Sequence, residues 1–290
     1  MIKHKRVINS LIALTLSLLP LAADAQGSPD TYVDPRIGSE GLGRVFIGPS
    51  APYGMVKPSP DCTCAPNSGW LPMPEQVDGF AQVHVSGTGG GPKYGNILVM
   101  PFGGGMDRIS PIYYREYENI KLGYYDTKFI NTRIRTEITT SRRASFYRFT
   151  YPADSLKSLL VNCGFFLGES PVPDAREAQQ FVGSEVRIES GNSLSGYSRI
   201  RGGWNNGKAY TVYFYAETDV PFETYYTWKG DRISDAESQY DSAEKTGALL
   251  RFPSSAQTVN LKIGISFVSS LKAKENLRSD IPHWSFERVR

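Results

Sequence analysis

The chain has 290 residues, of which 40% are hydrophobic, 12% aromatic and 21% charged. This is an ordinary globular composition, and it excludes disorder as the default state. The 32 basic and 29 acidic side chains are well mixed and leave a formal net charge of only +3, so neither nucleic acid nor an anionic membrane surface is expected as a partner.

The first 25 residues have the three parts of a secretory signal peptide in order. Basic side chains lie within the first six residues, residues 8–21 are mostly apolar, and a small-x-small cleavage pattern ends at Ala25. A transmembrane anchor is disfavoured because the apolar run is shorter than the ~20 residues that a bilayer span requires. We therefore expect cleavage after Ala25 and a secreted or periplasmic product without a membrane span.

Three cysteines, Cys62, Cys64 and Cys163, are an odd number for an exported chain. At least one of them stays unpaired unless it bonds to another chain. A zinc site is disfavoured because only His84 and His283 follow the signal peptide, and neither has zinc-ligand spacing to the cysteines. Two alternatives stay open, buried thiols or one disulfide to Cys163, and no metal site is predicted.

Residues 79–101 place a glycine-rich loop between two strand-like runs. A phosphate-binding loop needs Gly-Lys followed by Ser or Thr, but here Pro92 precedes Lys93 and Tyr94 follows it. A dinucleotide-binding fingerprint fails as well, because a proline stands where its third glycine belongs. Residues 96–101 are predicted as a strand that ends at a proline, and the loop needs a role other than binding phosphate.

Alternation of apolar and polar side chains dominates the chain between Gln26 and Ser270. A period of two is typical of half-buried strands, and clusters of turn-forming residues separate the runs. The pattern predicts strands over residues 132–140, 144–151, 158–165, 185–190, 210–217 and 259–267. In the last of these, the apolar side chains from Val259 to Phe267 are expected to face one side. The fold class is therefore all-β, a large antiparallel β-sandwich.

Helical spacing is confined to the end of the chain. Apolar positions four residues apart predict a helix over residues 271–281, and a second, aromatic-rich segment follows over residues 283–290. Trp284 and Phe286 in that segment are side chains that need burial. We expect residues 271–290 to be a helical linker that begins a further domain, and a short docking helix is the alternative.

Four blocks of the sequence occur in a recognisable order and spacing: Tyr32–Gly38, Pro52–Val56 with Ser59–Asp61, Val77–Gly89, and Asn96–Pro101. Together they resemble the N-terminal domain of glycoside hydrolase family 92, whose members are exo-acting, calcium-dependent α-mannosidases. The resemblance implies a galactose-mutarotase-like supersandwich over residues 26–270. It also implies that residues 271–290 are the truncated start of an (α/α)6 catalytic domain.

The resemblance further implies an inverting reaction. One carboxylic acid protonates the leaving oxygen, and a carboxylate on the opposite face of the sugar activates water. In the family, the acid, the base and most calcium ligands come from the C-terminal barrel. Calcium is thus the implied cofactor, mannose-containing glycans are the implied substrates, and this chain alone is expected to lack the acid and the base.

Four acidic residues, Asp34, Asp61, Glu75 and Asp78, lie near the blocks that carry the resemblance. Asp34 precedes a proline and Asp61 follows one, so both are predicted as turn residues. No catalytic carboxylate is assigned within this chain.

The glycine-rich loop corresponds to the family's signature loop, where glycine lets the backbone approach a sugar or a partner domain closely. The candidate substrate-binding residues are Gly69, Trp70, His84, Ser86, Gly87, Thr88, Gly89 and Trp204. His84 matches a histidine of the family signature. The three residues before it, Ala81-Gln82-Val83, depart from the usual Ser-His-Thr.

Each candidate also has a structural explanation. Trp70 and Trp204 stand in glycine-flanked loops, where an exposed ring would pack on a sugar, but core packing explains a tryptophan equally well. His84 lies between two valines, and a histidine at such a position is more often structural. The hydroxyls of Ser86 and Thr88 would bind a sugar or merely stabilise a tight turn.

Two other functions are compatible with the sequence. A non-catalytic carbohydrate-binding module would expose an aromatic platform, with Trp70 and Trp204 on one face. An assembly domain would use the glycine-rich loop to dock a partner. A large exposed apolar face would instead favour the loss of a companion domain.

Overall fold

The computed structural model describes residues 28–41, 45–62, 68–86, 92–107, 109–169, 178–203 and 207–290. The chain divides into two compact units, residues 1–33 and residues 34–290. In the first unit, the described residues form the short 3-10 helix η2 (Pro29–Tyr32). The predicted signal peptide lies outside the described residues.

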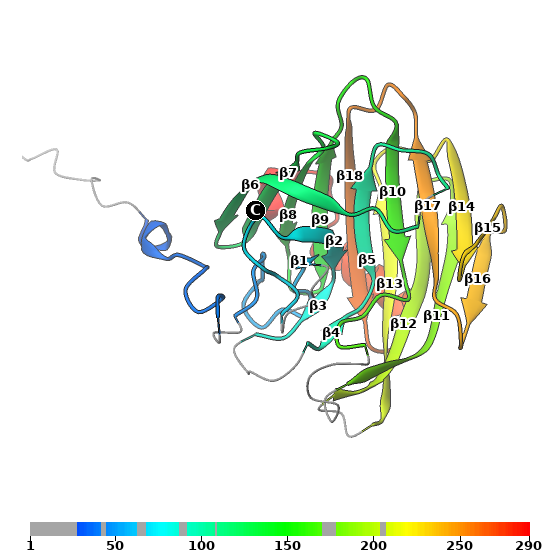
Figure 1. Ribbon diagram of the computed structural model, residues 1–290, viewed down its shortest axis with the longest axis horizontal. Helices are drawn as coiled ribbons and strands as arrows, with labels where there is room; N and C mark the ends of the chain where they lie inside the picture. Colours follow the sequence, from blue (N-terminus) through cyan, green and yellow to red (C-terminus); the bar gives the residue numbers. More distant parts are fainter. Residues whose placement is uncertain are drawn as a thin grey trace, which may run out of the picture. The chain divides into compact units, whose positions relative to one another are not determined.

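The second unit is built on a 16-stranded sheet that folds into two layers. Strands β5, β10 and β17 of the first layer lie in front of β18, β13 and β12 of the second (Figure 1). The first layer, in spatial order, consists of β15 (Arg232–Ser234), β14 (Thr224–Lys229), β17 (Thr246–Phe252), β10 (Lys157–Asn162), β5 (Leu98–Phe102), β2 (Gln76–Ala81) and β1 (Ser59–Cys62).

The second layer continues from β2 through its pairing with β6. Its strands, in spatial order, are β6 (Tyr113–Lys121), β7 (Tyr124–Phe129), β8 (Arg135–Thr140), β9 (Ala144–Thr150), β18 (Thr258–Ser266), β13 (Ala209–Thr218), β12 (Ser193–Gly202), β11 (Gln179–Ser190) and β16 (Ser238–Asp241). The ladders between these strands are antiparallel, which confirms the predicted all-β sandwich.

The main core lies between the layers, where each strand contributes the side chains of its inner face. On β18, Val259, Leu261 and Ile263 point into this core, as do Val212 and Phe214 on β13. Side chains of the first layer meet them, among them Val99, Leu159, Val161 and Leu250. Phe267 does not continue the series. It lies past the end of β18 and is 52% exposed, so the prediction that it shares the buried face is wrong.

A second, smaller core covers the outer face of the second layer. Helix α2 (Ser270–Asp280) packs on β18 and β13, and the short helix α3 (Phe286–Val289) follows it. This core contains Tyr124, Ala144, Phe146, Tyr215, Ala273, Leu277, Ile281 and Phe286. Gly264 on β18 permits the close approach, because a Cβ there would lie 2.4 Å from the carbonyl oxygen of Ala273.

Polar contacts fix the position of α2. The Ser269 side chain caps its first turn by accepting a hydrogen bond from the N–H of Lys272. At the other end, the Asp280 carboxylate accepts hydrogen bonds from the backbone N–H and the guanidinium of Arg143. Burial alone would raise the pKa of Asp280, but these hydrogen bonds outweigh it and lower the pKa.

The end of the chain therefore packs on the sandwich. Phe286 is only 3% exposed, whereas Trp284 is partly exposed. Helices α2 and α3 thus contact the sheet, and the role of residues 271–290 as the start of a further domain stays a prediction. Within the part of the chain that the structure describes, no helix is long and apolar enough to cross a membrane.

Helix α2 offers a matched pair of leucines that tests this packing. Leu277 is fully buried against the sheet, whereas Leu271 is 67% exposed. We expect Leu277→Ala to lower the free energy of unfolding by ~2–5 kcal/mol, because it removes buried methyl groups and leaves a cavity. Leu271→Ala should change it by less than ~0.5 kcal/mol. Urea unfolding of both variants measures the difference, and equal effects would show that α2 does not dock as described.

Candidate functional site

The centre of the candidate site is a buried pair of side chains, Asp61 and His84. Asp61 lies on β1, and His84 ends β3 (Val83–His84), which pairs with β4 (Tyr94–Gly95). His84 Nε2 lies 2.8 Å from Asp61 Oδ1, and both side chains are completely shielded from solvent. His84 Nδ1 lies 2.7 Å from the carbonyl oxygen of Lys57.

Hydrogen-bond chemistry determines the roles of the atoms in this pair. A carbonyl oxygen only accepts, so Nδ1 of His84 carries a proton and donates it to Lys57. Asp61 Oδ2 accepts from the backbone N–H of Ala81 at 2.9 Å. The remaining oxygen of Asp61 shares one further proton with Nε2 of His84. Each polar atom of the pair therefore has a partner, which buried polar groups require.

Gly69 lies directly against this pair. Its φ of +87° is in the left-handed region, and a Cβ at this position would lie 2.3 Å from Asp61 Oδ1 and 3.1 Å from His84 Nε2. The carbonyl oxygen of Gly69 accepts from the N–H of Cys62 at 2.7 Å. Glycine is thus required at position 69 both by its backbone conformation and by the space that the pair leaves.

Trp70 is buried, so the structure selects core packing from the two explanations that the sequence left open for this residue. The residue is 3% exposed and belongs to the main core. Its Nε1–H donates to the Glu118 carboxylate, with distances of 3.0 and 3.2 Å to the two oxygens. The flanking glycine does not turn the ring outward, because a hydrogen bond from Leu71 N–H to Cys62 Sγ holds the segment against β1.

Glu118, on β6, gathers three donors from different parts of the chain. Besides Trp70, it accepts from the hydroxyl of Tyr125 at 2.5 Å and from Arg115 at 2.6 Å. Arg115 in turn donates to the carbonyl oxygen of Leu71 at 2.6 Å. Burial is the main cause that raises the pKa of Tyr125 well above its usual value, so its hydroxyl stays protonated and donates. This network fixes both the indole and the backbone that follows it.

Neither Glu118 nor Arg115 was singled out by the sequence. Both lie on a strand in which four of nine residues are charged, and such a composition is typical of a solvated face. Their separation by three residues does not indicate a buried ion pair on a strand, since an ion pair on the surface of a helix has the same spacing.

Two of the three cysteines lie within the described residues, and neither forms a disulfide. Cys62 and Cys163 are free and buried, so the structure selects buried thiols for these two, and Cys64 lies outside the described residues. Burial raises the pKa of Cys62 to about 12, which keeps the thiol protonated near neutral pH.

The prediction of turn positions for Asp34 and Asp61 is right only for Asp34. The backbone N–H of Arg36 donates to Asp34 Oδ1 at 3.0 Å in an exposed turn. Asp61 instead lies on a strand, opposite Gly79 of β2. The adjacent Pro60 suggested a turn, but the antiparallel pairing of β1 with β2 extends the chain there.

Gln82 is a further buried polar residue of this region, at a position where the sequence departs from the family signature. Its amide nitrogen donates to the hydroxyl of Tyr147 at 2.7 Å, and its amide oxygen accepts from Ser145 at 2.6 Å. The backbone carbonyl of Gln82 accepts from Lys57 N–H at 2.9 Å. The departure from the signature therefore lies at a buried polar contact beside the strand that carries His84.

The structure brings together three of the predicted site residues, Gly69, Trp70 and His84. Ser86 follows β3 and is partly exposed. The remaining candidates, Gly87, Thr88, Gly89 and Trp204, lie outside the described residues. Among the residues that are described, no group of three or more His, Cys, Asp or Glu is arranged to hold a metal ion.

The contact of Gly69 with the buried pair can be tested directly. We expect Gly69→Ala to lower the free energy of unfolding by at least ~1 kcal/mol, because the new methyl group collides with the Asp61 carboxylate and the backbone is left-handed. Gly191→Ala is the control, since a Cβ there meets no atom within 4 Å and the residue lacks a left-handed φ. Urea unfolding compares the two, and a loss no larger than that of the control would contradict the described geometry.

The Glycosyl hydrolase family 92 N-terminal domain matches residues 32–266 of the chain. A protein of Arthroderma benhamiae named as a secreted glycosidase is 26% identical over 305 residues, which cover 97% of this chain and 39% of the relative. The chain thus spans well under half of that relative.

Solved structures give the same fold. A family GH92 α-mannosidase from Bacteroides thetaiotaomicron in complex with mannoimidazole superposes with a TM-score of 0.78 at 22% identity, covering 90% of this chain and 35% of that one. A family GH92 inverting mannosidase from the same organism gives a TM-score of 0.70 at 20% identity, covering 91% and 35%. The chain belongs to glycosyl hydrolase family 92, of which it carries the N-terminal domain.

Proposed function

We propose that this chain is the N-terminal domain of an exported, calcium-dependent, inverting α-mannosidase, and that the candidate site forms one wall of its sugar pocket. The observation that carries the proposal is the buried His84–Asp61 pair with Gly69 packed against it. The pair joins two of the sequence blocks that resemble the family, Ser59–Asp61 and Val77–Gly89. A fixed framework of this kind is what a substrate pocket needs.

The described residues have different roles in this proposal. Ser86 is partly exposed, so its hydroxyl is available to a sugar. His84 acts by holding the strand that leads into the glycine-rich loop, since both of its ring nitrogens are already engaged. The N–H of Trp70 is taken by Glu118, so any sugar contact of Trp70 would use the ring itself. Gly69, Gly87, Thr88, Gly89 and Trp204 complete the proposed set.

The acid and base belong to the part of the enzyme beyond this domain in our proposal. Inversion needs two carboxyl groups on opposite sides of the scissile bond, with room for a water between them. Among the described residues, no three His, Cys, Asp or Glu side chains are grouped to hold a metal ion, so in this proposal the calcium ligands belong mainly to the further domain. No catalytic step is therefore assigned to calcium or to a carboxylate of this chain.

A non-catalytic carbohydrate-binding module is the second candidate function. It would present an exposed aromatic platform. Among the described residues, Trp70 was the candidate for this platform, and its ring is buried. Within the part of the chain that the structure describes, no specific contact favours a pure assembly role.

The proposal predicts that residues 26–290 alone release no mannose. A longer protein with the helical domain should release mannose from α-mannosides, should lose activity with a chelator, and should regain it with calcium. NMR of the first-formed sugar should show the inverted anomer.

In that longer protein, Ser86→Ala should lower kcat/KM about tenfold, the effect of losing one sugar hydrogen bond. The exposed Ser254→Ala is the control. Calcium-dependent mannose release by residues 26–290 alone would overturn the two-domain part of the proposal.

Export is the second part of the proposal, and the relative named as a secreted glycosidase supports it. We expect expression with export to yield a mature chain that begins at Gln26. N-terminal sequencing or intact mass of the exported material measures this. Exported protein that retains Met1 would contradict cleavage after Ala25.

A further inference from the structure

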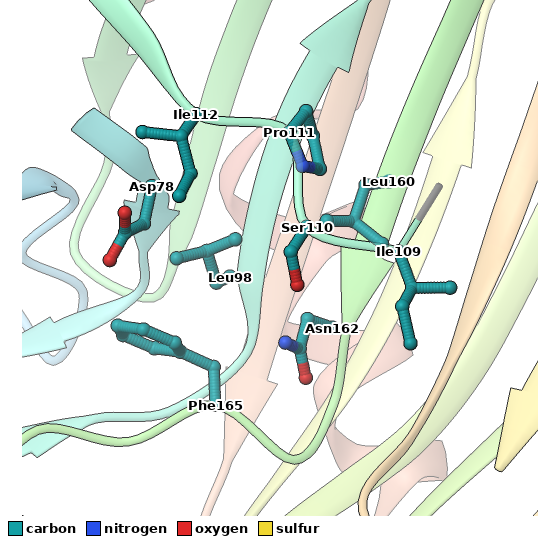
Figure 2. Close-up of a pocket in the computed structure, with 9 residues that line it drawn as sticks. All are labelled: Asp78, Leu98, Ile109, Ser110, Pro111, Ile112, Leu160, Asn162 and Phe165. Atoms are coloured by element: carbon teal, nitrogen blue, oxygen red, sulfur yellow. The ribbon is translucent and has the colours of Figure 1, made fainter. Parts of the chain in front are cut away.

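A pocket of about 180 Å³ opens on the outer face of the first layer (Figure 2). None of its lining residues belongs to the candidate site around His84. The volume is slightly larger than the ~150 Å³ cavity that admits a six-membered ring in other proteins. The pocket is therefore large enough for one ring-sized ligand.

The topology explains why a pocket forms here. Leu98 on β5 pairs with Asn162 on β10, so both side chains project from the same, outer face of the sheet. The connection from β5 to β6 then crosses back over this face and supplies residues 109–112 of the lining. Arg251 holds the connection by donating to the carbonyl oxygen of Gly104 at 2.9 Å.

The floor and walls of the pocket are mainly apolar. Leu98 and Leu160 form the floor and are almost fully buried. The ring of Phe165 stands on one side, and Ile112 on the opposite side is 43% exposed (Figure 2). An occupant with an apolar face would cover this surface and remove it from water.

Polar groups stand at the rim of the same pocket. The Ser110 hydroxyl points toward Asn162, whose amide nitrogen faces the side of Leu98 and Phe165 (Figure 2). The amide oxygen of Asn162 accepts from the N–H of Gly164 at 3.1 Å. This bond fixes the amide orientation, so Nδ2 is the atom presented as a donor. Asp78 adds a carboxylate to the lining, which disfavours an anionic occupant.

We propose that this pocket is a second carbohydrate site, which binds one neutral pyranose ring. The C–H face of a pyranose is apolar and packs on Phe165 and the leucine floor, while its hydroxyls accept from Asn162 Nδ2 and exchange hydrogen bonds with Ser110. The site is separate from the proposed sugar pocket around His84 and does not depend on it. A ligand of this size held by few hydrogen bonds binds with a Kd on the order of 1 mM.

The test uses the purified chain and methyl α-D-mannopyranoside as the probe, with binding followed by NMR chemical-shift changes. We expect saturable binding that Ser110→Trp abolishes by filling the pocket. Asn162→Asp should weaken it at least tenfold, because it keeps the oxygen that accepts from Gly164 but loses the amide donor. Ser254→Trp, a similar change at an exposed serine elsewhere, should leave it unchanged. Circular dichroism and thermal melting check that each variant is folded.

Three results would overturn the proposal. The first is that the probe shows no saturable binding up to ~100 mM. The second is that the folded Ser110→Trp variant binds the probe as well as the wild type does. The third is that cyclohexylmethanol binds whereas the pyranoside does not. The last result would identify a merely apolar pocket. The binding measurement needs no mannosidase activity, so a failure to bind the probe would not contradict the proposed function. In the same way, a longer protein without mannosidase activity would not contradict this second carbohydrate site.

Discussion

The contact between Asp61 and His84 is the constraint on which this end of the sandwich depends. It is a hydrogen bond between two side chains that are completely shielded from solvent. Removing either partner leaves a buried polar group without compensation, which costs more than the pair itself contributes. The geometry around it follows from this requirement: Lys57 supplies the acceptor, Ala81 supplies the donor, and position 69 must be glycine.

A second buried network lies beside the first and shares a chain segment with it. Glu118 accepts from three donors, and one of them is the indole of Trp70, the residue that follows Gly69. The segment from Ser68 to Leu71 is therefore held at one side by the Asp61 pair and at the other by the Glu118 network. A loop bounded in this way keeps its shape without a ligand, and preorganisation lowers the entropic cost of binding.

The sequence predicted the strands that have a regular pattern and missed those that do not. Residues 132–140, 144–151 and 259–267 alternate clearly, and each overlaps an observed strand, β8, β9 and β18. Strands β6 and β7 were not predicted, because charged and hydroxyl residues occupy positions that are in fact buried, such as Thr127 and Arg115. Their burial depends on partners far along the chain, which no local pattern contains.

In the candidate site, too, the sequence predicted the residues that have a local signal and missed those that depend on distant partners. His84 was found through a motif that resembles the family, whereas Gly69 and Trp70 were found because an aromatic residue beside a glycine in a loop is a local signal. Asp61 was placed in a turn and Glu118 was not noticed, because their roles come from hydrogen bonds across 23 and 48 residues of sequence. Whether a tryptophan ring faces water or the core depends on its partner, and that partner was missing from the local sequence.

The pairing of β2 with β6 has a consequence for how the chain folds. This pairing joins the two layers into one sheet, and it involves only Gln76 with Tyr114 and Val77 with Tyr113. Elsewhere in the sheet, β5 pairs with β10 and β10 pairs with β17, although these strands are distant in sequence, and the bond from Asn96 to Ser198 spans 102 residues. The entropy of closing such long loops is lost before the contacts can compensate for it. High contact order of this kind places a domain among slow folders, in the range of milliseconds to seconds. The Glu118 network joins Trp70 to strands β6 and β7 of the second layer, so it forms only when these parts of the chain have met.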